Sequence, residues 1–151
     1  MRIEYLPDDQ QTIQQVATWL YSEWGHLSRG STLERAIRRI SRRAQARTLP
    51  LTLVARDNGT PVGTASLVTH GMRTRLDLTP WLGAVYFLPK YRGRGIGTAL
   101  CRRAVREARR LGYERVYLFT PDKSEFYKAL GWKKIHRAKY RNQNVTVMAF
   151  G

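Results

Sequence analysis

The stretch Val85-Tyr-Phe-Leu-Pro-Lys-Tyr-Arg-Gly-Arg-Gly-Ile-Gly-Thr98 decides the fold of this chain. It begins as an apolar, strand-like run that stops at Pro89. Three glycines then alternate with Arg94 and Ile96, and a helical pattern follows at once. Glycines here allow backbone torsions and close approaches that a side chain would block. Successive backbone N–H groups at the start of a helix can hold a phosphate or pyrophosphate, so the stretch predicts an anion site between a strand and a helix.

The spacing of the glycines excludes two better-known phosphate loops. A Walker loop needs a lysine directly after its last glycine, and no glycine of this chain is followed by lysine. A dinucleotide fingerprint needs Gly-x-Gly-x-x-Gly, but its last position is Thr98 when counted from Gly93 and Leu100 when counted from Gly95. The pattern that fits is Arg-x-x-Gly-x-Gly over residues 92–97, directly after a strand that ends in proline.

This motif resembles the acetyl-CoA signature of the GCN5-related N-acetyltransferases, or GNAT family, in which the loop grips the pyrophosphate of coenzyme A. A later segment, Glu125-Phe-Tyr-Lys-Ala-Leu-Gly-Trp132, resembles the second signature of that family and follows the glycine loop at the typical distance. The resemblance implies a cofactor site formed by the strand end, the loop and the segment before the second motif. Its expected members are Val85, Tyr86, Phe87, Arg92, Gly93, Arg94, Gly95, Ile96, Gly97, Thr98 and Thr120.

The resemblance also implies direct acetyl transfer from acetyl-CoA to a primary amine, without an acyl-enzyme. A backbone N–H near residues 85–87 would stabilise the negative oxygen of the reacting carbonyl. Tyr127 matches the family's general acid, and a tyrosine hydroxyl stays protonated at neutral pH, as that role requires. Asp77, just before the fourth strand, is the expected general base, and Glu23 and His70 are left as alternatives.

The length indicates one domain over residues 1–151, because a chain of this length can bury a sizeable core, and the resemblance implies that it is an N-acetyltransferase domain. No apolar run approaches the ~20 residues of a membrane span. The N-terminus lacks an apolar signal core, so we expect a cytoplasmic protein. The one cysteine, Cys101, is expected to be a buried packing residue rather than a nucleophile. The three histidines have no ligand spacing, so no metal site is expected.

The positive charge leaves alternative functions open. Lys and Arg number 27 against 11 acids, which gives a net charge of +16. A nucleic-acid-binding protein or a non-catalytic acyl-CoA sensor on the same fold is the alternative to an enzyme. Few aromatic residues interrupt the basic blocks, which disfavours nucleic-acid binding, and the retained Tyr127 disfavours a sensor. The expected partner is an amine acceptor, either a small molecule or a protein amino group; homodimers are frequent in the resembling family.

The element order predicted from periodicity is β-α-α-β-β-β-α-β-α-β-β. It matches the acetyltransferase fold, of the α/β (α+β) class, with a mixed, mostly antiparallel central sheet of six or seven strands and about four helices. We expect a second helix capped by Ser31, with Glu34 completing a capping box. Its arginines are expected to be solvated and to steer an acidic acceptor toward the site. These are Arg35, Arg38, Arg39, Arg42 and Arg43.

Overall fold

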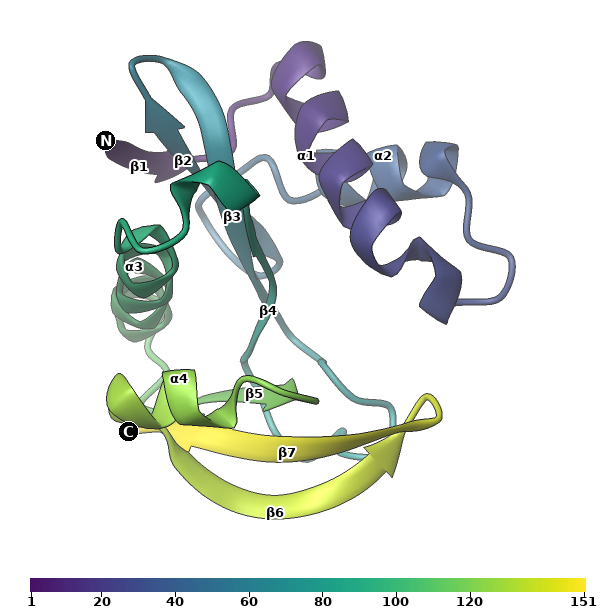
Figure 1. Cartoon of the computed structure of the whole chain (residues 1–151), viewed down its shortest axis with the longest axis vertical. Helices are drawn as coiled ribbons and strands as arrows, with labels where there is room; N and C mark the ends of the chain where they lie inside the picture. The colour runs from purple at the N-terminus through teal and green to yellow at the C-terminus, as the bar shows by residue number, and fades with distance from the viewer.

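The centre of the protein is a mixed sheet of seven strands, drawn in Figure 1. The computed structural model describes residues 1–151. The strands are β1 (Arg2–Tyr5), β2 (Leu51–Asp57), β3 (Thr60–Val68), β4 (Trp81–Phe87), β5 (Val116–Thr120), β6 (Lys133–Tyr140) and β7 (Gln143–Phe150). The helices are α1 (Gln10–Trp24), α2 (Leu33–Ser41), α3 (Ile96–Arg110) and α4 (Ser124–Ala129), with short 3-10 turns η1 (Gly25–Leu27) and η2 (Pro89–Tyr91). The predicted order of strands and helices is confirmed.

The strand order in the sheet is β1-β2-β3-β4-β5-β7-β6. Every neighbouring pair is antiparallel except β4 and β5, which are parallel and pair in register only at Trp81 and Tyr117. Beyond that point the two strands diverge, and Figure 1 shows the sheet opening into an upper half that ends in β4 and a lower half that begins with β5. The sheet is therefore open between β4 and β5.

Helices cover both faces of the sheet, and strand alternation explains how one strand serves both layers. In β2, Leu53 and Ala55 join the core under α3, whereas Val54 joins the core under α1 and α2. The α3 core also contains Leu100 and Ala104, which lie one helical turn apart on the inner face of α3. A third, aromatic-rich core lies around Trp81, Tyr117 and Tyr140, where the two halves of the sheet meet.

The second helix differs from the sequence prediction at both ends. Its N-cap is Thr32, not Ser31, because the Thr32 hydroxyl accepts a hydrogen bond from the Arg35 N–H at 3.2 Å. The helix ends at Ser41, and beyond it the carbonyl oxygen of Arg43 accepts a hydrogen bond from the Thr52 N–H.

Arg43 does not lie on the solvated face of α2, where the sequence analysis placed it. Its side chain is partly buried, and this burial, with the adjacent charge of Arg39, lowers the pKa of Arg43 from 12.5 to about 10. The prediction continued the helical period past Ser41 and so placed Arg43 on the outer face. In the structure, α2 has already ended before Arg43. The remaining four arginines of the predicted set are exposed.

Candidate active site

A β-bulge in β4 lies in the region where the sheet opens. Leu82 and Val85 both face the α3 core although they are three residues apart, and Ala84 takes a φ of +52°. The register between β3 and β4 shifts across Thr64 and Ser66, opposite the bulged residues. Because β5 has already diverged, the edge of β4 from residue 83 to residue 87 has no partner strand on that side. Three expected cofactor residues, Val85, Tyr86 and Phe87, lie on this free edge.

The glycine loop joins this edge to the start of α3. Gly93 and Gly95 have φ values of +77° and +76°, the left-handed region that glycine occupies without steric cost. Gly95 is the N-cap of α3, and no side chain caps the first turn. The first N–H groups of a helix have no intrahelical partner, so those of Ile96, Gly97 and Thr98 are available to an anion.

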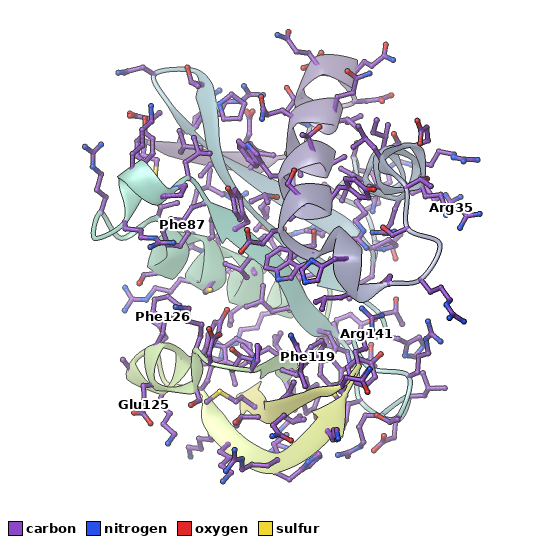
Figure 2. All side chains as sticks on the ribbon, turned by 45° about the vertical axis from the view of Figure 1, so that its right-hand side comes forward. Arg35, Phe87, Phe119, Glu125, Phe126 and Arg141 are labelled. Carbon is purple, nitrogen blue, oxygen red and sulfur yellow. The ribbon has the colours of Figure 1, made fainter.

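Gly97 is required for a different reason, the close packing of α3. A Cβ atom built on Gly97 would lie 3.1 Å from Cε1 of Phe87 and 3.4 Å from Cζ of Phe126. The missing side chain thus lets the end of β4, the start of α3 and α4 approach one another. Figure 2 shows the labelled Phe87 above Phe126, on the side of the molecule where α3 and α4 lie.

Tyr91 supports the loop, and the sequence analysis did not identify it. Its hydroxyl donates a hydrogen bond to Oδ2 of Asp57 at 3.0 Å, which ties η2 to the end of β2. The guanidinium of Arg94 lies over the Tyr91 ring at 4.9 Å. Arg94 and Arg92 are both exposed beside the free amides, so the loop combines backbone donors with two positive charges.

Tyr127 lies on α4, in contact with the rings of Phe126 at 5.1 Å and Trp132 at 6.0 Å. Burial raises the pKa of Tyr127 well above its ordinary value, with smaller contributions in the same direction from Cys101 and Asp122. The side chain is therefore protonated throughout the physiological pH range. Cys101 is 1% exposed, and burial raises the pKa of its thiol to about 12, which agrees with a packing role.

Thr120 is the last residue of β5, and its hydroxyl accepts a hydrogen bond from the N–H of Lys123 at 2.9 Å. The side chain is buried, and this bond shapes the turn between β5 and α4. The position of Thr120 thus has a structural explanation in the free protein, and its contact with the cofactor stays a prediction.

Asp77 lies in the loop before β4 and is engaged by a basic neighbour. Its two carboxylate oxygens accept hydrogen bonds from Nε and Nη2 of Arg75, both at 3.0 Å. The bond from Arg75 lowers the pKa of Asp77, which makes the carboxylate a weaker base. Nη1 of Arg75 also lies 2.5 Å from Nε2 of His136 on β6. The other two candidate bases, Glu23 and His70, are exposed.

Aromatic side chains gather on the sheet face opposite α3, where β4 and β5 diverge. Tyr86 on β4 contacts Trp19 and Trp24 of α1 at ring distances of 5.7 and 6.4 Å. On the other side of the opening, Phe119 and Arg141 both contact the Tyr140 ring, at 5.4 and 5.3 Å, and Figure 2 labels the two near the middle of the molecule. The sequence analysis missed this group, for which the alternation of Tyr117 and Phe119 in a strand was the only signal.

The glycine loop, the free edge of β4 and the tyrosine of α4 fall within one family pattern. The sequence model described as the Acetyltransferase (GNAT) family matches residues 13–132. This chain belongs to the GNAT family. The family is one of acetyltransferases. A search among curated protein sequences finds no significant match.

Solved structures show the same fold over nearly the whole chain. An aminoglycoside 6'-N-acetyltransferase complexed with coenzyme A is 16% identical, with a TM-score of 0.78; the match covers 99% of this chain and 96% of that one. The ribosomal-protein-alanine N-acetyltransferase of Brucella melitensis is 19% identical, with a TM-score of 0.77, and 99% and 98% of the two chains are covered. The Salmonella typhimurium protein yncA, solved with its cofactor acetyl-CoA, is 19% identical at a TM-score of 0.75, with 99% and 92% covered. No helix of this GNAT protein is long and apolar enough to cross a membrane.

Proposed function

We propose that this GNAT enzyme holds the pyrophosphate of acetyl-CoA on the loop of residues 92–98 and the acetylated arm in the opening between β4 and β5. The support is the coincidence of three features: free amides at the start of α3, two exposed arginines, and an unpaired strand edge. Helix N-termini and guanidinium groups both favour phosphate oxygens. The unpaired edge of β4 offers backbone donors and acceptors to the amide groups of the pantetheine arm.

Acetyl-CoA supplies an activated thioester, which a neutral primary amine attacks directly. A backbone N–H of residues 85–87 stabilises the negative charge that develops on the carbonyl oxygen as the new C–N bond forms. Tyr127 donates its hydroxyl proton to the sulfur as the C–S bond breaks, so that coenzyme A leaves as a thiol; the proton that the acetylated nitrogen gives up restores the Tyr127 hydroxyl. Burial raises the pKa of Tyr127, so the hydroxyl is protonated before the reaction, although it is then a weaker acid than an exposed tyrosine.

We propose that solvent at the mouth of the opening, rather than Asp77, takes the proton of the incoming ammonium. The ion pair with Arg75 lowers the pKa of Asp77 and occupies both of its oxygens. Asp77→Asn should therefore leave the pH dependence of kcat/KM unchanged. If kcat/KM of the unmodified enzyme falls with the titration of one carboxylate, and this pH dependence is absent in Asp77→Asn, then Asp77 is the general base.

The observation that carries the proposal is the conformation of the loop before α3. Its test is calorimetric titration with coenzyme A, followed by a thiol-release assay with acetyl-CoA and a panel of amines. We expect coenzyme A to bind and free thiol to appear only when an amine is present. Failure of coenzyme A to bind the folded protein would remove the proposed function.

A further inference from the structure

The outer face of α2 carries a hollow lined only by arginines. Its volume is about 370 Å³, and its walls are the side chains of Arg35, Arg38, Arg39 and Arg42, here called the α2 arginine groove. All four residues are exposed, and Figure 2 shows the labelled Arg35 pointing away from the body of the protein. None of the four takes part in any of the six ion pairs of the protein.

Positive charge at the end of α2, where Arg38 and Arg39 lie, favours the helix, and Arg35 donates a hydrogen bond to the carbonyl oxygen of Gly30, but no ion pair offsets the repulsion among the arginines of this groove. Arg35 and Arg39, and also Arg38 and Arg42, are four residues apart, a spacing at which like charges repel. The only acid on α2 is Glu34, in its first turn. The same crowding contributes to the lowered pKa of Arg43, next to Arg39. An external anion would relieve this repulsion, which the protein itself leaves uncompensated.

The inner face of the same helix reaches the region of the active site. Ala36 and Ile40 are buried in a core against which Ile37 and Tyr86 pack, and Tyr86 lies on the free edge of β4. The helix α2 packs on α1, which in turn contacts Tyr86 through Trp19, so the groove lies on the same side of the sheet as Tyr86.

At least five of the 11 acids of the protein are engaged by partners within it. Glu4, Asp77, Glu107 and Glu125 form ion pairs, and Asp57 accepts the hydrogen bond from Tyr91. Two basic side chains lie near the opening: Arg75, which is paired with Asp77, and Arg141 beside Tyr140. A substrate with several positive charges would meet repulsion from this surface.

We infer that the α2 arginine groove binds an acidic polypeptide segment whose amino group is the acceptor of this enzyme; the inference rests on the proposed function. Guanidinium forks match carboxylates in geometry as well as in charge. The groove has no apolar or aromatic side chain on which a nucleic-acid base could stack. The other basic helix, α3, covers the opposite face of the sheet (Figure 1), so the two do not form one continuous track for a duplex.

The test compares peptides that differ only in charge, with a free N-terminus and a fluorescent label at the C-terminus. One carries Glu at each position after the first, the second carries Gln there and the third Lys. Two triple variants reverse the same amount of charge: Arg38→Glu/Arg39→Glu/Arg42→Glu in the groove and Lys133→Glu/Lys134→Glu/Lys139→Glu on exposed positions of β6. A neutral triple, Arg38→Gln/Arg39→Gln/Arg42→Gln, replaces the groove variant if the reversed charges unfold α2. The measurement is fluorescence anisotropy in low salt and at physiological salt, where charges are screened over ~8 Å.

We expect the Glu peptide to bind the unmodified protein about tenfold more tightly than the Gln peptide in low salt. The groove variants should lose this preference, while the β6 variant keeps most of it. Equal binding of the Glu and Gln peptides, or an equal loss in both triple variants, would overturn the inference. Tighter binding of a single-stranded RNA than of the Glu peptide, with the same dependence on the groove, would assign the groove to nucleic acid instead.

Calorimetry with coenzyme A separates this inference from the proposed function. All variants should bind coenzyme A with unchanged affinity, because the loop of residues 92–98 is untouched. Absence of a preference for the Glu peptide in the unmodified protein, with coenzyme A binding intact, contradicts only the acidic acceptor. Absence of coenzyme A binding in the unmodified protein contradicts the enzyme proposal itself.

Discussion

Trp81 and Tyr117 form the only pair in register between the parallel strands β4 and β5. Their rings lie 5.9 Å apart, within the buried core at the point where the two halves of the sheet separate. The N–H of Tyr117 also bonds to the carbonyl oxygen of Pro80 at 3.0 Å. These contacts close the sheet at one end and leave the other end of β4 free, which is the arrangement that the proposed cofactor site needs.

Removal of the Tyr127 hydroxyl should slow the reaction without unfolding the protein. Tyr127→Phe keeps the ring contacts with Phe126 and Trp132, so thermal stability and coenzyme A affinity should be unchanged. We expect kcat to fall by about ten- to a thousand-fold, the lower range of general-acid effects, because a thiolate is already a fair leaving group. Tyr113→Phe, on another partly buried tyrosine, is the control. An unchanged kcat, with chemistry shown to limit the rate, would make Tyr127 a packing residue.

The left-handed backbone of Gly95 can be tested with two substitutions of different torsional preference. A Cβ at this position would meet no atom within 4 Å, so any defect in the free protein comes from the φ of +76°. Gly95→Ala should weaken coenzyme A binding by roughly five- to thirty-fold, whereas Gly95→Asn should retain more affinity because asparagine tolerates this conformation. Calorimetry gives both values. An alanine variant that binds as well as the unmodified protein would show that the torsion does not matter.

Charge reversal at Arg94 tests the electrostatic part of the same loop. Arg94→Glu places a negative charge beside the free amides, where the proposal puts the pyrophosphate, and should weaken coenzyme A binding. Arg115→Glu is a matched control, since Arg115 is exposed and precedes β5, outside the glycine loop. The comparison is made by calorimetry at low and high salt. If both variants bind coenzyme A equally well, Arg94 has no part in holding phosphate.

Glu107 should make folding sensitive to acid. Its carboxylate is buried, which raises its pKa, but hydrogen bonds from Tyr5, Arg110 and Arg103 outweigh burial and lower the pKa below the ordinary 4.5. A lowered folded-state pKa contributes stability that is present above about pH 4.5 and is lost as the pH falls through the folded value. Glu107→Gln should therefore cost about 1–3 kcal/mol at neutral pH and should flatten the decline toward acid.

Urea unfolding measured between neutral pH and about pH 3 checks the direction in which stability changes with pH. Glu125→Gln is the control, because Glu125 is exposed and pairs only with Lys128. A Glu107→Gln variant whose stability declines with acid as steeply as that of the unmodified protein would contradict the assignment.

Cys101 should be inert in the folded enzyme. Burial raises the pKa of its thiol to about 12, so almost no thiolate exists near pH 8. Alkylation by iodoacetamide should be slow in buffer and fast in urea, as mass spectrometry can show. Cys101→Ala should keep kcat within about twofold, since direct transfer needs no acyl-enzyme. Rapid alkylation that abolishes activity would point to a nucleophilic cysteine instead.

Local features of the chain were sufficient for the order of the elements. The glycine loop, the helical period of α3 and the hairpin turn between β2 and β3 act within a few residues, so they are legible in the sequence. The glycines at 93 and 95 were expected to free the backbone, and both take positive φ values. The prediction placed Arg43 on the outer face of the helix, but α2 ends at Ser41, and the carbonyl oxygen of Arg43 bonds to the distant Thr52 N–H.

Tertiary structure alone decided the partners and the burial of the charged and aromatic groups. Glu107 accepts a hydrogen bond from Tyr5, 102 residues away, and Arg75, the partner of Asp77, contacts His136 on β6, 61 residues away. The opening between β4 and β5 arises because two halves of the sheet meet at one registered pair, which no periodicity encodes. Burial and pairing set pKa values, and both depend on chain segments brought together by folding. The sequence could therefore predict an acetyl-CoA site, but which of its acids are free to act could be read only from the folded protein.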